Sequence, residues 1–128
     1  EHGHVPRIEQ IYSERIRGKV RYTAACNTLF QGLGADGAKA ALWAVTKACY
    51  LPGSILQGSR VVNFVHDQLI VEVPEEFGHE LALEVGRLMV DACNVYLPDV
   101  PVSCSPCLSS SWRKNATDVY VDPVAGAA

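Results

Sequence analysis

Residues 60–74 constrain the fold most, because two apolar, β-rich runs meet there with only a His-Asp pair between them. The runs 60–65 and 68–73 carry the β-branched and aromatic residues that are typical of strands. His66 and Asp67 join them without the Gly or Asn-Gly that tight hairpin turns favour. The segment therefore predicts a β-hairpin with His66 and Asp67 at its tip.

The acidic side chain at this tip predicts a binding role. Asp is depleted in strands and its charge is costly to bury, so a carboxylate in a tight hairpin turn indicates a site for a positive partner. A divalent metal ion is the natural candidate. Taken alone, His-Asp is a short motif, and a polar turn whose His66 caps a backbone carbonyl explains it equally well.

Apolar residues at helical spacing predict three helices. The long middle helix contains Gly32, Gly34 and Gly37, each of which costs about 1 kcal/mol relative to Ala, so a close neighbouring backbone, of protein or nucleic acid, is expected there. The expected helices are a charged one over 8–22, one from Asn27 or Thr28 (either as its cap) to Cys49 or Tyr50, and one over 75–97 opened by Pro74.

These elements predict one compact α+β unit over residues 1–128. The hairpin 60–73 and an edge strand at 100–104 are expected to form one antiparallel sheet, backed by the helices 27–50 and 77–97. Residues 113–128 are weakly patterned and are expected to form a flexible tail. No apolar run approaches the roughly 20 residues of a membrane span, and no signal peptide opens the chain, so a cytoplasmic protein without membrane contact is expected.

Charge is distributed unevenly along the chain. The net charge is −3, which argues against a stand-alone nucleic-acid binder, because such domains are usually basic. Residues 1–60 hold eight Lys/Arg and four Asp/Glu, whereas residues 61–128 hold three and ten. The asymmetry suits a protein that holds phosphates on one side and metal cations on the other, although a solvated helix face explains any single charge as well.

The five cysteines have no spacing typical of a secreted disulfide framework, so reduced thiols are expected. Cys104 and Cys107 are spaced like half of a zinc site, which His2 and His4 would complete. Structural zinc sites usually combine two such pairs and only one is present, which argues against the zinc site.

Three separated segments agree in order and spacing with one known pattern. They are Asn27 to Asp36 (Asn-x-x-x-Gln-Gly-x-x-Ala-Asp), the His66-Asp67 hairpin, and the closing stretch from Pro101 to Trp112; Gly3, Pro6 and Ile8 add a fourth match. The set resembles the C-terminal part of a family A DNA polymerase, the group of bacterial DNA polymerase I and its phage relatives.

The resemblance implies a palm-type sheet, with the end of the fingers at residues 1–26. It implies that Asp67 is one of two aspartates that hold two Mg²⁺ ions, and that His66 contacts the backbone of the primer end. Asn27 and Gln31 lie four residues apart, on one helical face, where amides read minor-groove edges or sugars. The implied partners are primer-template DNA and a dNTP in a bacterial or phage-infected cell.

The chain departs from the family pattern at several positions. Gln68 stands where the family has Glu after His-Asp, Thr23 stands where it has Arg, with Arg21 as a possible substitute, and Leu29 stands where it has Pro. The family's other catalytic Asp and its fingers helix have no counterpart in these residues. The resemblance therefore implies that the N-terminal palm and fingers are supplied in cis or by a separate chain, and that the isolated 128 residues are inactive.

Two rival functions follow from the same residues. An HD-type phosphohydrolase also uses His-Asp with metal, but on helices and with further His ligands, whereas the flanks here are strand-like. A non-catalytic DNA-binding or assembly module that keeps the palm fold is favoured by Gln68 and by the single aspartate.

Overall fold

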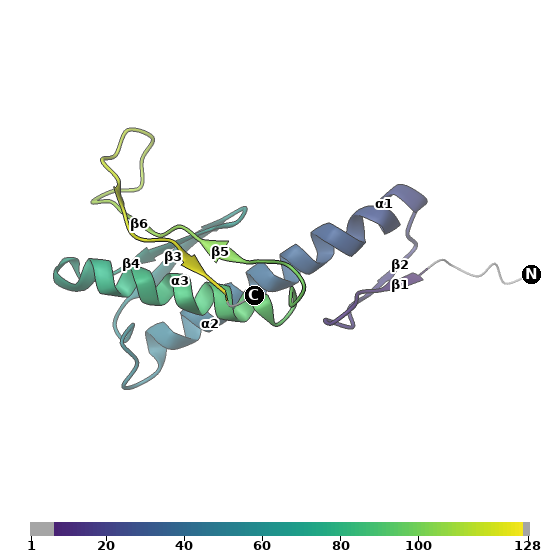
Figure 1. The fold of residues 1–128 in the computed structure, drawn as a ribbon, viewed down its shortest axis with the longest axis horizontal. Coiled ribbons are helices and arrows are strands. Elements are labelled where there is room, and N and C mark those ends of the chain that lie inside the picture. Colours follow the sequence, from purple (N-terminus) through teal and green to yellow (C-terminus); the bar gives the residue numbers. More distant parts are fainter. Residues whose placement is uncertain (1–6, 127–128) are drawn as a thin grey trace, which may run out of the picture.

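The computed structural model describes residues 7–126. Its two long helical segments lie against each other, and four short strand pairs surround them (Figure 1). The first segment is continuous from Tyr22 to Tyr50 and consists of α1 (Tyr22–Asn27), the π-helical turn η1 (Thr28–Gly32) and α2 (Leu33–Tyr50). The second is α3 (Gly78–Asn94), which follows the 3₁₀ turn η2 (Glu75–Phe77).

All strands pair antiparallel, in four separate two-stranded sheets. This arrangement confirms an α+β fold, but the expected single sheet is wrong, because the strand near residue 103 pairs with the end of the chain and not with the 60–73 hairpin. The pairs are β1 (Arg7–Glu9) with β2 (Ile16–Gly18), β3 (Arg60–Val65) with β4 (Gln68–Glu72), β5 (Ser103–Cys104) with β8 (Val124–Ala125), and β6 (Cys107–Leu108) with β7 (Val119–Tyr120).

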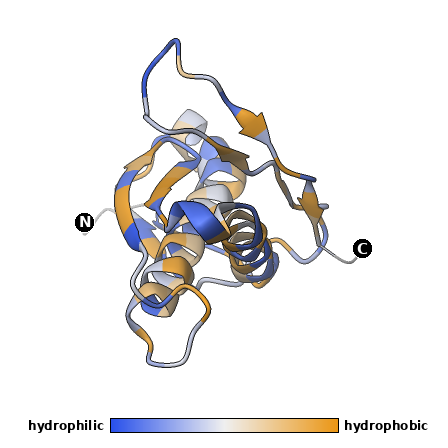
Figure 2. Cartoon of the chain, turned by 90° about the vertical axis from the view of Figure 1, so that its left-hand side faces the viewer, coloured by the Kyte–Doolittle hydropathy of each residue, from blue (hydrophilic) through white to orange (hydrophobic). Residues whose placement is uncertain are grey.

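The core lies where α2 and α3 meet the central hairpin. Val45 and Cys49 are one helical turn apart on α2 and are buried together with Leu56, in the loop after α2, and Leu81 on α3. Side chains of β3, β4 and α3 complete the cluster. Figure 2 shows the two helices nearly end-on, with the β3–β4 hairpin on one side and the C-terminal segment on the other. The C-terminal segment includes β7 and β8, in the region for which the sequence predicts a tail.

The predicted charged helix over 8–22 is wrong, because β1 and β2 form a hairpin there. The connection between them turns sharply: Tyr12 and Glu14 have φ of +65° and +54°, which a right-handed helix does not allow. The amide of Gln10 donates to the carbonyl of Arg15, and the amide of Glu14 donates back to that of Gln10, both at 2.9 Å. The regular spacing of the isoleucines in this segment therefore reflects a hairpin and not a helix.

The long helix begins earlier than the sequence predicts. Arg21 precedes its first turn, so Asn27 and Thr28 are internal residues with helical φ of −67° and −64° and do not cap it. The Thr28 hydroxyl donates at 2.7 Å to the carbonyl of Ala24, four residues back, as Ser and Thr do inside helices. The helix end at Tyr50 and the helix opened at Pro74 agree with the prediction.

The glycines of this helix approach neighbours at two of three positions. Gly32 lies against the side chain of Gln10, and Gly37 lies against Cys93 of α3. A side chain at Gly34 would meet nothing within 4 Å. Among the helices of residues 7–126, none has the length and apolar character needed to cross a membrane.

Candidate functional site

The tip of the β3–β4 hairpin is a two-residue turn, as the sequence predicts. Pairing ends at Val65 and Gln68, which leaves His66 and Asp67 between the strands. His66 has a φ of +57°, in the left-handed region that costs a residue with a side chain roughly 1–2 kcal/mol. Strain of this kind persists only where the surrounding structure enforces it, and it is concentrated at functional sites. Here the paired strands enforce it.

The carboxylate of Asp67 is available to a ligand. Asp67 is exposed, and neither the ion pairs nor the side-chain hydrogen bonds within residues 7–126 involve it. Mg²⁺ is a hard cation that prefers such oxygen ligands. Asp67 therefore fits as one ligand of a metal ion.

The described residues do not complete a metal site. No group of three or more His, Cys, Asp or Glu side chains in the range 7–126 is placed to hold a metal ion. Mg²⁺ is usually held by one or two carboxylates together with water and substrate phosphates. At the hairpin tip, this part of the chain therefore offers one exposed carboxylate with the right chemistry.

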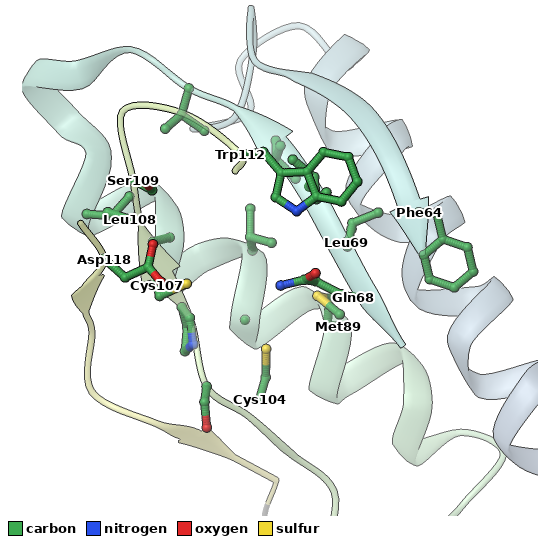
Figure 3. Close-up of a pocket in the computed structure, with 18 of the residues that line it drawn as sticks. Phe64, Gln68, Leu69, Met89, Cys104, Cys107, Leu108, Ser109, Trp112 and Asp118 are labelled. Carbon is green, nitrogen blue, oxygen red and sulfur yellow. The ribbon is translucent and has the colours of Figure 1, made fainter. Parts of the chain in front are cut away.

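Asp67 and its neighbour Gln68 line an open cleft of about 1610 Å³. The cleft lies between α2, the hairpin, α3 and the C-terminal segment, and its α2 wall includes Gly34 and Ala38. Figure 3 shows Gln68 and Leu69 of β4 and the indole of Trp112 among the side chains around it. Arg113 and Lys114 also line it, so the cleft holds both cationic and anionic groups.

The predicted helix residues lie outside this cleft. Asn27 ends α1 and Gln31 is inside η1, and both are exposed. Gln31 lies three residues before Gly34, which does line the cleft. The structure therefore brings Asp67 and Gln68 together with α2, but His66, Asn27, Gln31 and Arg21 are not among the lining residues.

Sequence reasoning missed a set of polar contacts around η1. They join the β1–β2 hairpin to the long helix through Gln10, Ser13, Arg15 and Arg17, and we call these four residues the clasp. Ser13 and Arg15 bind Asp36 of α2, at 2.7 and 3.0 Å. Asp36 belongs to the Asn27–Asp36 motif, and its side chain is only 9% exposed. The only signal in the sequence was a charged residue among Ala and Gly.

The cysteines of the C-terminal segment lie close to α3. Cys104 is half-buried and Cys107 is exposed. Burial raises the pKa of the Cys104 thiol, and burial together with the nearby Cys104 raises the pKa of Cys93. A raised pKa disfavours the thiolate that binds zinc. His2 and His4, the partners considered for these cysteines, lie outside the described residues.

Comparison with known proteins decides the family. The model of DNA polymerase family A matches residues 3–114. This chain belongs to DNA polymerase family A. A curated relative, DNA polymerase I of Aquifex aeolicus (strain VF5), is 29% identical to the chain over 94 residues. That match covers 73% of this chain and 16% of the Aquifex protein, so the chain spans about a sixth of its relative. No solved structure matches the chain significantly.

Proposed function

We propose that this chain is the C-terminal palm portion of a DNA-directed DNA polymerase that adds nucleotides to a primer 3′ end. The observation that carries the proposal is the free Asp67 carboxylate at a strained hairpin tip, in a chain of family A. Asp67 holds Mg²⁺ in the complete enzyme, and His66 contacts the primer-end backbone. In such enzymes a pair of Mg²⁺ ions activates the 3′ hydroxyl and holds the triphosphate and leaving group.

The long helix contributes DNA contacts in this proposal. Asn27 and Gln31 are exposed and four residues apart, close to one helical turn, so their amides meet the minor groove together. Arg21, exposed at the start of the helix, meets a phosphate. Gly34 lies further along the same helix and also favours a DNA contact, because the absence of a side chain there leaves the wall of the cleft open. Gln31→Ala is expected to weaken primer-template binding by about 1–2 kcal/mol, the scale of one lost hydrogen bond.

The complete enzyme needs metal-binding and dNTP-binding groups that these 128 residues do not supply. The second metal-binding carboxylate and the groups that grip the dNTP come from an N-terminal palm and fingers segment, present in the same chain or supplied as a separate one. A lone, solvated carboxylate binds Mg²⁺ weakly, because this ion gives up its water reluctantly. The 128 residues alone are therefore expected to extend no primer.

The test is Mg²⁺-dependent primer extension by the 128 residues joined to the N-terminal palm and fingers of a family A polymerase. Asp67→Ala is expected to abolish extension while primer-template binding persists. Asp122→Ala removes an exposed carboxylate outside the cleft lining and serves as the matched control. Full extension by the Asp67→Ala enzyme, or extension by the 128 residues alone, overturns the assignment of Asp67.

The rival function is a non-catalytic DNA-binding module, and Gln68 favours it. Gln68 lies next to Asp67 and lines the same cleft, so it replaces a negative charge near the metal position by a neutral amide. Gln68→Glu is expected to change the Mg²⁺ concentration needed for extension and to leave primer-template affinity almost unchanged. DNA binding without extension, both before and after Gln68→Glu, supports the module instead.

A further inference from the structure

The long helix changes its geometry where the proposed DNA contacts lie. Residues Thr28–Gly32 form a π-helical turn, whereas the segments before and after it are α-helical. Single π-helical turns inside α-helices are rare and occur frequently at functional sites. Asn27 precedes this turn and Gln31 lies in it. The turn therefore sets the angle at which both amides stand relative to α2.

The clasp supplies hydrogen-bond donors to this turn. In a π-helix the amide bonds five residues back instead of four, so carbonyl groups at its edges lose their regular partners. Arg15 Nη2 donates to the carbonyl of Gly32 at 3.3 Å, and Gln10 Nε2 donates to that of Leu29 at 3.4 Å. Arg17 Nη1 donates to the Thr28 hydroxyl at 2.8 Å. Side chains of the hairpin thus bind the π-helical turn at three points.

Three further features hold the clasp in place. Asp36 orients Arg15, because its carboxylate accepts the same Nη2 atom at 3.0 Å. Gln10 is 2% exposed, and its Oε1 lies so close to Gly32 that a Cβ there would overlap it. At the far side, the Tyr12 hydroxyl donates to Asp99 at 2.8 Å and ties the hairpin to the loop after α3.

We infer that Arg15 and Gln10 are positioning residues, which hold Thr28–Gly32 as a π-helical turn and thereby aim Asn27 and Gln31 at the primer-template. The inference rests on the proposed function, because its readout is DNA contact by those amides. Without the clasp, the segment regains regular bonding by becoming α-helical. A π-helical turn holds about one residue more than an α-helical turn, and one residue of an α-helix corresponds to a rotation of about 100°. The change to an α-helix therefore rotates Asn27 by roughly that angle relative to α2.

The experiment is a double-mutant cycle in the complete polymerase, with primer-template Kd as the readout. Gln31→Ala is expected to weaken binding about tenfold, which is the fold-change of 1.4 kcal/mol. Arg15→Ala is expected to weaken it by a similar factor, and the double variant is expected to bind no worse than either single variant. Non-additivity of this size identifies residues that act through one another.

Three controls separate positioning from direct DNA contact. Arg7→Ala removes an exposed charge from the same hairpin and is expected to leave affinity within twofold. Arg15→Lys keeps a donor and a charge near Asp36 and is expected to restore most of the affinity. Amide hydrogen exchange of unliganded Arg15→Ala is expected to accelerate across residues 28–33 and to remain unchanged in α3.

The outcomes distinguish the inference from the proposed function. If Gln31→Ala leaves Kd unchanged, the helix contact in the proposed function is wrong and the inference falls with it. If Gln31→Ala weakens binding but Arg15→Ala does not, only the inference is overturned. If the two effects multiply, or if exchange across residues 28–33 does not change, Arg15 acts on DNA or on the fold by another route and the inference is also overturned.

Discussion

The two ends of the helix from Tyr22 to Tyr50 are held to the molecule by different forces. At the Tyr50 end, Val45 and Cys49 pack against Leu56 and Leu81, and all four are buried. At the Tyr22 end, α1 buries no residue, and the surrounding contacts are hydrogen bonds and an ion pair from the clasp. One helix therefore joins an apolar core to a polar, largely exposed region.

The difference separates stability from the proposed function. Apolar burial is non-directional and fixes elements together with little regard for the angle of individual side chains. Hydrogen bonds depend steeply on distance and angle, so a clasp of polar contacts specifies orientation at small net stability. The residues that we propose to contact DNA lie at the polar end, where orientation matters most.

The largest expected effect is at the apolar end. Leu56→Ala removes a fully buried side chain and is expected to lower the free energy of unfolding by about 2–5 kcal/mol. Chemical denaturation of the 128-residue chain measures the change. Leu51→Ala, at a position that is 50% exposed, is the matched control and is expected to stay within about 0.5 kcal/mol. Equal losses at the two positions contradict the placement of the core.

An intermediate effect is expected at the junction of the two ends. Asp36→Asn removes the charge that Arg15 and Ser13 bind, and it is expected to lower the free energy of unfolding by about 1–2 kcal/mol. This value lies in the lower part of the range for charged hydrogen bonds, because Arg15 is 43% exposed. The denaturation midpoint reports the loss. Asp91→Asn, on the exposed face of α3, is the control, since its side chain is 58% exposed. A larger loss at Asp91 refutes the clasp as the stabilising contact.

The smallest effect is expected at Tyr12. Its hydrogen bond to Asp99, aided by partial burial and by the charge of Asp99, raises the pKa of the Tyr12 hydroxyl. A raised pKa means that the folded state favours the protonated hydroxyl, so this contribution is complete below the ordinary tyrosine pKa of about 10 and disappears as pH rises through the folded value.

The measurement is hydrogen exchange in the β1–β2 hairpin as the pH rises through this range. In the unmodified chain, the exchange rate of the hairpin amides is expected to rise with pH more steeply than the intrinsic rate of unprotected amides. Tyr12→Phe is expected to remove this additional rise. An identical pH profile for both chains means that the bond to Asp99 does not hold the hairpin.

The parts of the fold predictable from sequence are those that local chemistry determines. The β3–β4 hairpin was found within one residue of its predicted bounds, because alternation and the polar pair at 66–67 both act over a few residues. The same holds for the helix end at Tyr50, where Pro52 and Gly53 follow.

The predictions are wrong where contacts between residues far apart in the sequence determine the structure. Ile8, Ile11 and Ile16 have helical spacing, but Gln10 and Arg15 make their contacts with residues 17 or more positions away, and these contacts accompany a hairpin. The pairing of β5 with β8 joins residues that are 20 or more positions apart, and two-residue strands carry no periodicity that would predict it. Asp36 and the π-helical turn were missed for the same reason, since their partners lie in another element.

The left-handed backbone at His66 affects the free energy of ligand binding at the hairpin tip. The free-energy cost of the left-handed turn is incurred on folding and not on binding, because the strands that enforce the turn are already paired in the free chain. In the function that we propose, a cation therefore binds Asp67 in an already ordered loop, and little affinity is lost to ordering that loop. Such preorganisation would exchange a small amount of fold stability for tighter binding of the proposed ligand.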